Sequence, residues 1–392
     1  MDKTLNLVIA AYLLNNRRRR RHGRRFNVHP LVEKRLLKGE FVSLFSDLQD
    51  DEMKFFKYFK MSIRTFEELH AKLEPSLMRC DIYKKPICSR ERLAVTIRYL
   101  TTGSRMSDLH LSYRLGLSTI KYIIEEVCSL IWEILKNECL PEPDPNFWNK
   151  IALGFERDAN FPNCVGALDG KHTRITCPKE SGSVFFNHKQ FYSIILLAMC
   201  DANYCFTYVN VGACGSEADA NVFKKSSLFH RLERDDLNLP PPKLLPGTSI
   251  NPQPHVIVAD AAFGISNTIL RPYARTNLTH KKKIFNYRLS RARRYIESSF
   301  GILTNKFAIF QRSINVSTSF AQILIKACYI LHNFIRVRDG YTEEDAMIVA
   351  GFTDYNARIN DSTRSGNTIR DNFANYFVSN EGSLPWQNSY IY

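Results

Sequence analysis

The chain has 392 residues, of which 44% are hydrophobic and 12% aromatic, so it can bury a substantial core and is neither disordered nor fibrous. Its net charge is +15, from 54 Lys and Arg against 39 Asp and Glu. Two segments hold this excess: residues 1–40 have 11 basic and 3 acidic residues, and residues 271–296 have 9 basic and none acidic. Such localised charge favours a polyanionic partner, either nucleic acid or a charged membrane face.

Membrane-spanning and secreted proteins are not favoured. No stretch approaches the roughly 18–20 uninterrupted apolar residues of a spanning helix. The short apolar run from Leu5 to Leu14 precedes the arginines of 17–21, which is the wrong order for a secretory signal. The ten cysteines include no CxxC pair, so we expect reduced thiols in the cytosol or nucleus. Cys164, His172 and Cys177 lack a fourth ligand at zinc-site spacing.

The first part of the chain has helical periodicity. After a basic N-terminal arm over residues 1–40, apolar residues recur at three- and four-residue spacing to about residue 140. Within this helical domain, 41–140, a short helix from Met106 to Tyr113, a turn with Gly116 and a longer helix capped by Ser118 form a helix-turn-helix candidate. Such connections are also common in purely structural helical domains, and Lys121 adds little positive charge, so DNA reading by this element stays open.

The pattern changes after the proline-rich segment 141–145. Strand-like runs and helical patterns then alternate. We expect strands at 165–168, 192–200, 205–211 and 256–259, with helices at 216–232, 285–307 and 322–336. This order predicts an α/β fold over residues 160–340, in which a mixed sheet is flanked by helices, followed by a C-terminal tail over 341–392.

Three carboxylates stand at positions where they can meet. Asp169 closes the first predicted strand, Asp260 closes the fourth, and Glu297 lies on the long basic helix. Like charges at one sheet edge repel unless a cation lies between them, and oxygen ligands suit Mg²⁺ or Mn²⁺. The alternative is that each aspartate is a turn or cap residue and that Glu297 pairs with Arg293 or Arg294 on its own helix.

Basic residues lead directly into this helix. Metal-bound carboxylates beside cations are what phosphodiester cleavage needs, because metals activate the attacking oxygen and stabilise the leaving one while cations hold the backbone. We expect phosphate contacts from Lys281, Lys282, Lys283, Arg291 and Arg294. A solvated basic face is the alternative for each of them.

Many separated motifs, in order, resemble one known family. The stretch from Asn163 to His172 resembles the first catalytic segment of the PIF/Harbinger transposases and the nucleases derived from them. The similarity continues through 186–189, 191–193, 211–213, Asp219, 258–260, 285–293, 296–297, 300–301 and 331–333.

The resemblance implies a ribonuclease-H-like domain with a DDE triad. Asp169 and Asp260 match the two aspartates and Glu297 the glutamate, with 36 residues between the last two. Asp219 matches a further recurrent aspartate and is the second choice as a metal ligand. The family also implies a separate Myb/SANT-like protein as DNA-recognition partner, while the oligomeric state, including a homo-oligomer, is left open.

Two functions therefore compete. The first is a metal-dependent DNA endonuclease or transposase-like enzyme, and the second is a domesticated chromatin or DNA-associated factor with little or no catalysis. The residues at 261, 264, 298 and 299 depart from those usual in the family, but all three triad carboxylates are present. We expect nuclear residence, with the cytoplasm left open, because Arg17–Arg25 and Lys281–Lys283 resemble import signals.

Overall fold

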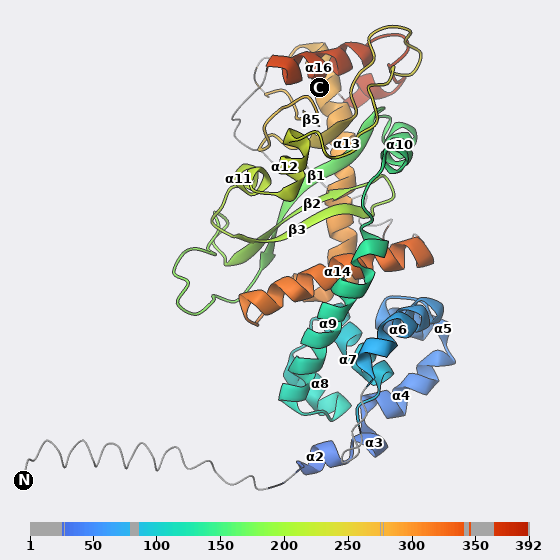
Figure 1. Cartoon of the computed structure of the whole chain (residues 1–392), viewed down its shortest axis with the longest axis vertical. Helices are drawn as coiled ribbons and strands as arrows, with labels where there is room; N and C mark the ends of the chain where they lie inside the picture. The colour runs from blue at the N-terminus through green and yellow to red at the C-terminus, as the bar shows by residue number, and fades with distance from the viewer. Residues whose placement is uncertain are drawn as a thin grey trace, which may run out of the picture.

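The computed structural model describes residues 28–78, 86–274, 278–340 and 364–390, and the single residues 26, 276 and 345. The predicted import segment Arg17–Arg25 lies outside the described residues. The molecule is elongated, with a helical domain at one end and the sheet at the other (Figure 1). The helical N-terminal region and the mixed α/β part follow in the order that the sequence predicts.

The helical domain is held together by an aromatic core. The rings of Phe45, Phe55, Phe59 and Phe66 pack with centroids 4.7–6.1 Å apart, and all four side chains are buried. Its helices are α2 (Pro30–Glu33), α3 (Arg35–Lys38), α4 (Glu40–Gln49), α5 (Glu52–Phe59), α6 (Ile63–Leu77), α7 (Ser89–Thr102), α8 (Met106–Tyr113) and α9 (Leu117–Cys139).

The helix-turn-helix candidate corresponds to α8 and α9. Arg114 ends α8 in the left-handed conformation, with φ 55°. The N-cap of α9 is Gly116, so the prediction of Ser118 as cap is wrong. The apolar stripe of α9 is buried as predicted and packs against α14 (Thr318–Asp339). Both ends of α9 have exposed residues, with Lys121 and Tyr122 in its first turns and Glu133 and Lys136 near its end.

A five-stranded mixed sheet forms the centre of the second part. The strand order is β3-β2-β1-β4-β5; β1, β2 and β3 are antiparallel neighbours, whereas β4 lies parallel to both β1 and β5. The strands are β1 (Cys164–Arg174), β2 (Ser193–Cys200), β3 (Phe206–Cys214), β4 (Val256–Ala259) and β5 (Ile269–Leu270). The sheet confirms the predicted α/β class, and its topology is consistent with a ribonuclease-H-like fold.

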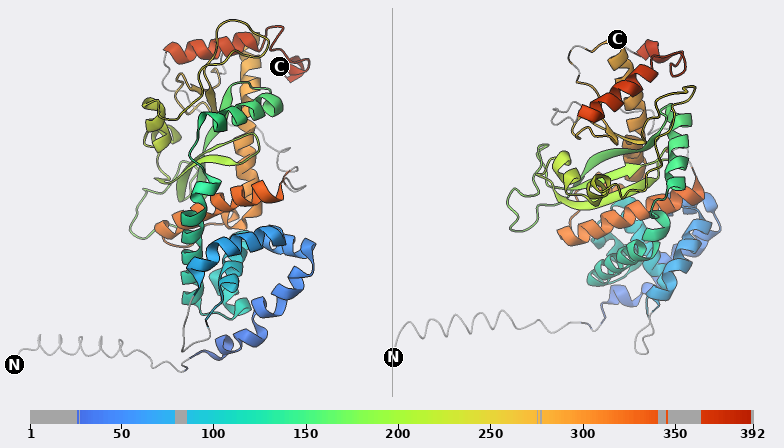
Figure 2. Two further views of the ribbon diagram at one scale, coloured as in Figure 1. Left: turned by 45° about the vertical axis from the view of Figure 1, so that its right-hand side comes forward. Right: turned by 45° about the horizontal axis from the view of Figure 1, so that its top comes forward.

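Helices cover both sides of this sheet. The longest one, α13 (His280–Lys306), runs behind it and contacts β1, β2 and β4, whereas α11 (Asp219–Lys224) and α12 (Ser227–Glu233) lie in front (Figures 1 and 2). Two further helical segments, α10 (Pro145–Gly154) and the π-helical turn η1 (Phe155–Ala159), lead into β1. The sheet is therefore sandwiched, and its middle strands β1, β2 and β4 are largely buried.

Some elements differ from the predicted ones. The helix expected over 216–232 is divided into α11 and α12, because Ser226 starts a new helix by accepting a hydrogen bond from Phe229 N at 3.2 Å. The two-residue strand β5 is too short for its pattern to be recognised. Within the expected C-terminal tail, helix α16 (Arg364–Tyr376) packs against α13 and β5.

Helix α14 joins the two parts of the molecule. It lies between β3 and α9 (Figure 1) and contacts both. By length and composition it is apolar enough to cross a membrane, but 78% of its most apolar window is buried inside the protein, as in a core helix.

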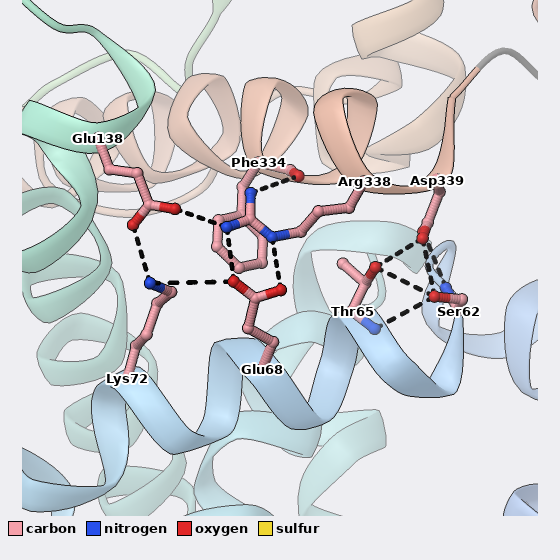
Figure 3. A network of polar contacts seen from close by, with 8 residues as sticks. All are labelled: Ser62, Thr65, Glu68, Lys72, Glu138, Phe334, Arg338 and Asp339. Carbon is pink, nitrogen blue, oxygen red and sulfur yellow. Dashed lines mark hydrogen bonds and ion pairs between the residues drawn. The ribbon is translucent and has the colours of Figure 1, made fainter.

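Polar contacts at the end of α14 fix the helical domain. Arg338 forms ion pairs with Glu68 of α6 at 2.6 Å and with Glu138 of α9 at 2.5 Å (Figure 3). The Asp339 carboxylate accepts hydrogen bonds from Ser62 N, Ser62 Oγ and Thr65 Oγ1 at 2.5–2.9 Å. Three helices are therefore joined by charge-assisted contacts at one point.

Candidate active site

Asp169 and Asp260 lie next to each other at the centre of the sheet. Leu168 in β1 is paired with Ala259, the last residue of β4, so the residue that follows each of them is an aspartate. Asp260 ends its strand as predicted. Asp169 does not, because β1 continues to Arg174 through its pairing with β2. The two carboxylates therefore meet where β4 stops and β1 loses one of its neighbours.

The surroundings of Asp169 disfavour its negative charge. Burial raises the pKa of the Asp169 carboxyl to about 7; Arg293 opposes this rise, and the carboxylates of Asp260 and Asp219 add to it. One oxygen of Asp169 accepts a hydrogen bond from Gly170 N, and one oxygen of Asp260 accepts one from Ala262 N, each at 2.8 Å. Each aspartate is thus oriented by a backbone N–H that follows it closely in the chain, and the second carboxylate oxygen takes no part in that bond.

Asp219 is the third carboxylate of this centre. It begins α11, and its carboxylate lies against the backbone of Gly170: a Cβ atom at position 170 would come within 2.5 Å of Asp219 Oδ1. Only glycine leaves room for this approach. Burial and the charge of Asp260 raise the pKa of Asp219. Among the described residues, its buried Oδ1 has no hydrogen-bond partner.

Glu297 comes to the site from α13, the helix that packs across β1 and β4. Its Oε1 accepts a hydrogen bond from Arg293 at 3.0 Å, which is the ion pair that the sequence left open as an alternative. In the part of the chain that the structure describes, no three His, Cys, Asp or Glu side chains come together in a formed metal site. Glu297 is linked to Asp169 through Arg293, which forms an ion pair with Glu297 and opposes the raised pKa of Asp169.

These donors fit a hard divalent cation by their chemistry. The available ligands are carboxylate oxygens. Among the described residues, Asp219 Oδ1 is buried without a hydrogen-bond partner, and burial raises the pKa of Asp169. A bound cation relieves both costs, because it neutralises neighbouring carboxylates and accepts their lone pairs. Asp169 and Asp260 would supply such oxygens from the adjoining strands β1 and β4, with Asp219 and Glu297 as further candidate ligands.

Lys171 connects the strand of Asp169 to the helix of Glu297. Its Nζ donates hydrogen bonds to Phe300 O at 3.2 Å and to Thr304 Oγ1 at 3.0 Å, both on α13. Burial lowers the pKa of Lys171 to about 8, and the Asp169 carboxylate opposes this shift. Successive side chains of a strand alternate between its faces, so Asp169 and Lys171 both lie on the α13 side of β1.

The loop between β1 and β2 brings two more basic side chains to the site. Asn187 shapes this loop by accepting hydrogen bonds from Lys189 N at 2.9 Å and Phe191 N at 3.3 Å. His188 and Lys189 are exposed, and both lower the pKa of Asp219 against the effect of its burial. These two residues were not among the predicted site residues, although they lie in one of the motifs that carried the resemblance.

The contacts of His172 indicate a structural role for this residue. Its Nδ1 lies 2.9 Å from Ser193 Oγ on β2, and its ring packs edge-on against His188 with centroids 5.6 Å apart. Burial lowers the pKa of His172 to about 4. The ring is therefore neutral at physiological pH and fixes the start of the loop that carries His188.

The predicted phosphate-binding residues occupy different environments along α13. Lys281 donates to Asn375 Oδ1 at 2.8 Å, and Lys282 lies 5.3 Å from the centre of the Tyr273 ring. Arg291 donates to Asn160 Oδ1 at 3.2 Å, whereas Arg294 is exposed. At 1.5 Å per residue, the lysines at 281–283 lie roughly 20 Å along the helix from Glu297.

Comparisons with known proteins agree with the predicted resemblance. Residues 168–333 match the family model of the DDE superfamily endonucleases, and this span includes Asp169, Asp219, Asp260 and Glu297. The protein ALP1-like of Arabidopsis thaliana is 25% identical over 75% of this chain and 73% of its own length. The Arabidopsis thaliana protein antagonist of like heterochromatin protein 1 is 22% identical over 76% of each chain. No solved structure matches the chain significantly. The predicted resemblance is confirmed: over residues 168–333 the chain is similar to the DDE superfamily endonucleases.

Proposed function

We propose that this protein is a metal-dependent DNA endonuclease that cleaves phosphodiester bonds at the centre formed by Asp169, Asp260 and Glu297. The observation that carries the proposal is that Asp169 and Asp260 follow paired residues of β1 and β4, with Asp219 close enough that its charge adds to the rise of the Asp169 pKa to about 7. Three acidic groups held together without a cation cost stability. Such a cost is typical of a site that stabilises a reaction rather than the fold.

Each side chain has a role in this proposal. Asp169, Asp260 and Glu297 would hold Mg²⁺ or Mn²⁺, with Asp219 as the adjacent carboxylate. The cation, when bound, supplies the activation of the attacking oxygen and the stabilisation of the leaving one. Lys171 keeps the strand of Asp169 at a fixed position on α13, and His188 and Lys189 bind the phosphate backbone next to Asp219.

More distant basic residues extend the DNA path. Lys281, Lys282 and Lys283 lie near the start of α13, whereas Arg291 and Arg294 lie within two helical turns of Glu297. A stretch of roughly 20 Å corresponds to about six base pairs of duplex at 3.4 Å per step. These residues would contact phosphates away from the scissile bond, so their loss weakens binding more than chemistry.

A second function is favoured by one observation. Arg293 forms an ion pair with Glu297, and among the described residues no three His, Cys, Asp or Glu side chains form a set that could hold a metal ion. A domesticated chromatin or DNA-associated factor that acts through a Myb/SANT-like partner needs the fold but not the metal. One relative is named as an antagonist of like heterochromatin protein 1, which agrees with such a role.

A nicking assay separates the two functions. Supercoiled plasmid is incubated with the full-length protein and Mg²⁺ or Mn²⁺, with and without a Myb/SANT-like partner, and the wild type is compared with Asp169→Asn, Asp260→Asn and Glu297→Gln. Glu133→Gln, an exposed carboxylate on α9, is the control. We expect each triad change to lower the nicking rate at least about 100-fold, whereas the control keeps it. Cleavage that survives all three changes contradicts the site, and no cleavage by the wild type favours the second function.

Nuclear residence is part of the proposal. The basic run Arg17–Arg25 is its main support, and Lys281–Lys283 is exposed enough to be a second signal. A fluorescent reporter fused to residues 1–40 should enter the nucleus, and replacement of the arginines by glutamine should prevent this. A reporter that stays in the cytoplasm excludes the arm as an import signal.

A further inference from the structure

The ion pair between Arg293 and Glu297 lies inside the acidic centre. The Arg293 guanidinium is 3.0 Å from Glu297 Oε1, and the two side chains are only 14% and 25% exposed. Arg293 is also the basic residue that most strongly opposes the raised pKa of Asp169, across the interface between α13 and β1. The guanidinium is therefore bonded to Glu297 on a helix that packs against the strand of Asp169.

Helix stability does not account for this pair. Acidic and basic residues four positions apart stabilise a helix best when the acidic residue comes first. Here Arg293 precedes Glu297, which is the weaker order. Among the described residues, the buried Nε of Arg293 also has no hydrogen-bond partner, so the guanidinium is held by charge more than by a complete set of hydrogen bonds.

We propose that Arg293 is a positioning residue that occupies the place of the divalent cation in the metal-free protein. This inference rests on the proposed metal site. In the metal-free state the guanidinium balances Glu297 and Asp169 and keeps the acidic centre folded. Metal binding then requires Arg293 to release Glu297, so the arginine sets both the stability of the empty site and the affinity of the filled one.

After it releases Glu297, Arg293 would be able to bind a second group. Once Glu297 turns to a metal ion, the guanidinium is next to a site that receives a phosphodiester, and its fork of donors matches phosphate oxygens. The positive charge of the metal ion would then be offset by the negative charge of the DNA phosphate, so the net charge of the site would change little. Binding of metal and binding of DNA are therefore expected to favour each other.

Metal titration of the full-length protein tests this inference without an activity assay. Mn²⁺ binding is measured by calorimetry on metal-free wild type, Arg293→Gln, Arg293→Lys and Arg312→Gln; the last removes an exposed positive charge outside the site. We expect Arg293→Gln to bind Mn²⁺ about tenfold more tightly than the wild type and to melt at a lower temperature without metal. Arg293→Lys should lie between the two, and Arg312→Gln should match the wild type.

A second measurement avoids dependence on a destabilised variant. In wild-type protein labelled with ¹⁵N-arginine, the side-chain resonance that is missing from Arg293→Lys should shift when Mg²⁺ is added and should stay constant in Asp169→Asn. An unchanged resonance at saturating Mg²⁺, or unchanged Mn²⁺ affinity in Arg293→Gln, overturns the inference.

The two proposals fail in different ways. If the wild type binds Mn²⁺ and Asp169→Asn does not, the metal site stands, and the Arg293 variants alone decide the role of the arginine. If Asp169→Asn, Asp260→Asn and Glu297→Gln all bind Mn²⁺ as the wild type does, the metal site is wrong and the inference about Arg293 is wrong with it.

Discussion

Lys171 Nζ donates a hydrogen bond to Thr304 Oγ1 at 3.0 Å, which links the strand of Asp169 to the helix of Glu297. We expect Lys171→Met to change the free energy of unfolding by no more than about 1 kcal/mol, because the loss of the bond is offset by the removal of a buried charge. Mn²⁺ affinity should fall about tenfold, since groups that orient metal ligands commonly contribute that much.

Thr304→Val tests the same hydrogen bond between Lys171 and Thr304 by changing its acceptor on α13. It removes one acceptor of Lys171 and should lower Mn²⁺ affinity in the same direction by a smaller factor. The double variant should be no weaker than Lys171→Met alone, because both changes break one link. Additive losses in calorimetric titrations contradict this link between the strand and the helix.

The buried ring of His332 should make the free energy of unfolding depend on pH. Its ring is fully buried with Nε2 2.8 Å from Tyr204 O, and burial lowers its pKa to about 3. The unfolded chain therefore binds more protons than the folded protein between pH 3 and 6.5, so the free energy of unfolding falls as the pH decreases through this window. The loss attributable to one such group is about 1.4 kcal/mol per pH unit at most.

His332→Gln removes this titration and keeps an amide donor for Tyr204 O. Urea unfolding at pH 7.5, 6.0 and 5.0 should show the wild type losing stability faster than the variant as the pH falls. His172, whose pKa is also lowered, is present in both proteins and cancels in the comparison. Parallel pH profiles exclude His332 as the cause.

The strand pattern indicated that Asp169 and Asp260 could meet at a sheet edge, because each follows an apolar run of strand length. That β1 and β4 are neighbours is seen only in the structure. The long helix was predictable from the helical spacing of its apolar residues, and Glu297 from the family motif at 296–297. Local pattern did not reveal that Asp169 lies in the middle of β1, since the length of a strand depends on which neighbours pair with it. The register with β2 continues five residues beyond Asp169.

The basic segment 271–296 shows why composition has limited value for a binding site. Arg288 is buried and donates to Gly382 O and Gln387 Oε1 at 3.1 Å, and Arg271 is buried with Phe263 O as acceptor at 3.2 Å. Those charges hold the C-terminal residues and a loop in place. Only contacts between distant parts of the chain distinguish them from exposed Arg294, and a charge count contains no such information.

Arg338 is expected to hold the helical domain on the sheet domain. Its partners Glu68 and Glu138 are 39% exposed, so solvent weakens each pair, and Arg338→Met should lower the free energy of unfolding by only about 1–2 kcal/mol. A double-mutant cycle with Glu68→Gln, followed by urea unfolding, should give a coupling energy of about 0.5–1 kcal/mol. A coupling energy of zero excludes this ion pair as a stabilising contact.

Gly170 determines how closely the Asp219 carboxylate can approach β1. A methyl group at position 170 would come within 2.5 Å of Asp219 Oδ1, whereas one at Gly264 would meet no atom within 4 Å. Gly170→Ala should therefore push the Asp219 carboxylate out of the acidic centre and lower Mn²⁺ affinity, whereas Gly264→Ala should leave the affinity unchanged. Because the short aspartate side chain can swing away, the stability of Gly170→Ala should stay within about 1 kcal/mol of the wild type.

Combining that change with the loss of Asp219 itself shows whether the carboxylate is the group displaced. Asp219→Ala should weaken Mn²⁺ binding by a similar factor, and Gly170→Ala in that background should have no further effect, because the methyl group then occupies space that the carboxylate has left. A second, independent loss of affinity would mean that Gly170→Ala acts through the backbone of β1. Unchanged affinity in Asp219→Ala would restrict the metal ligands to Asp169, Asp260 and Glu297.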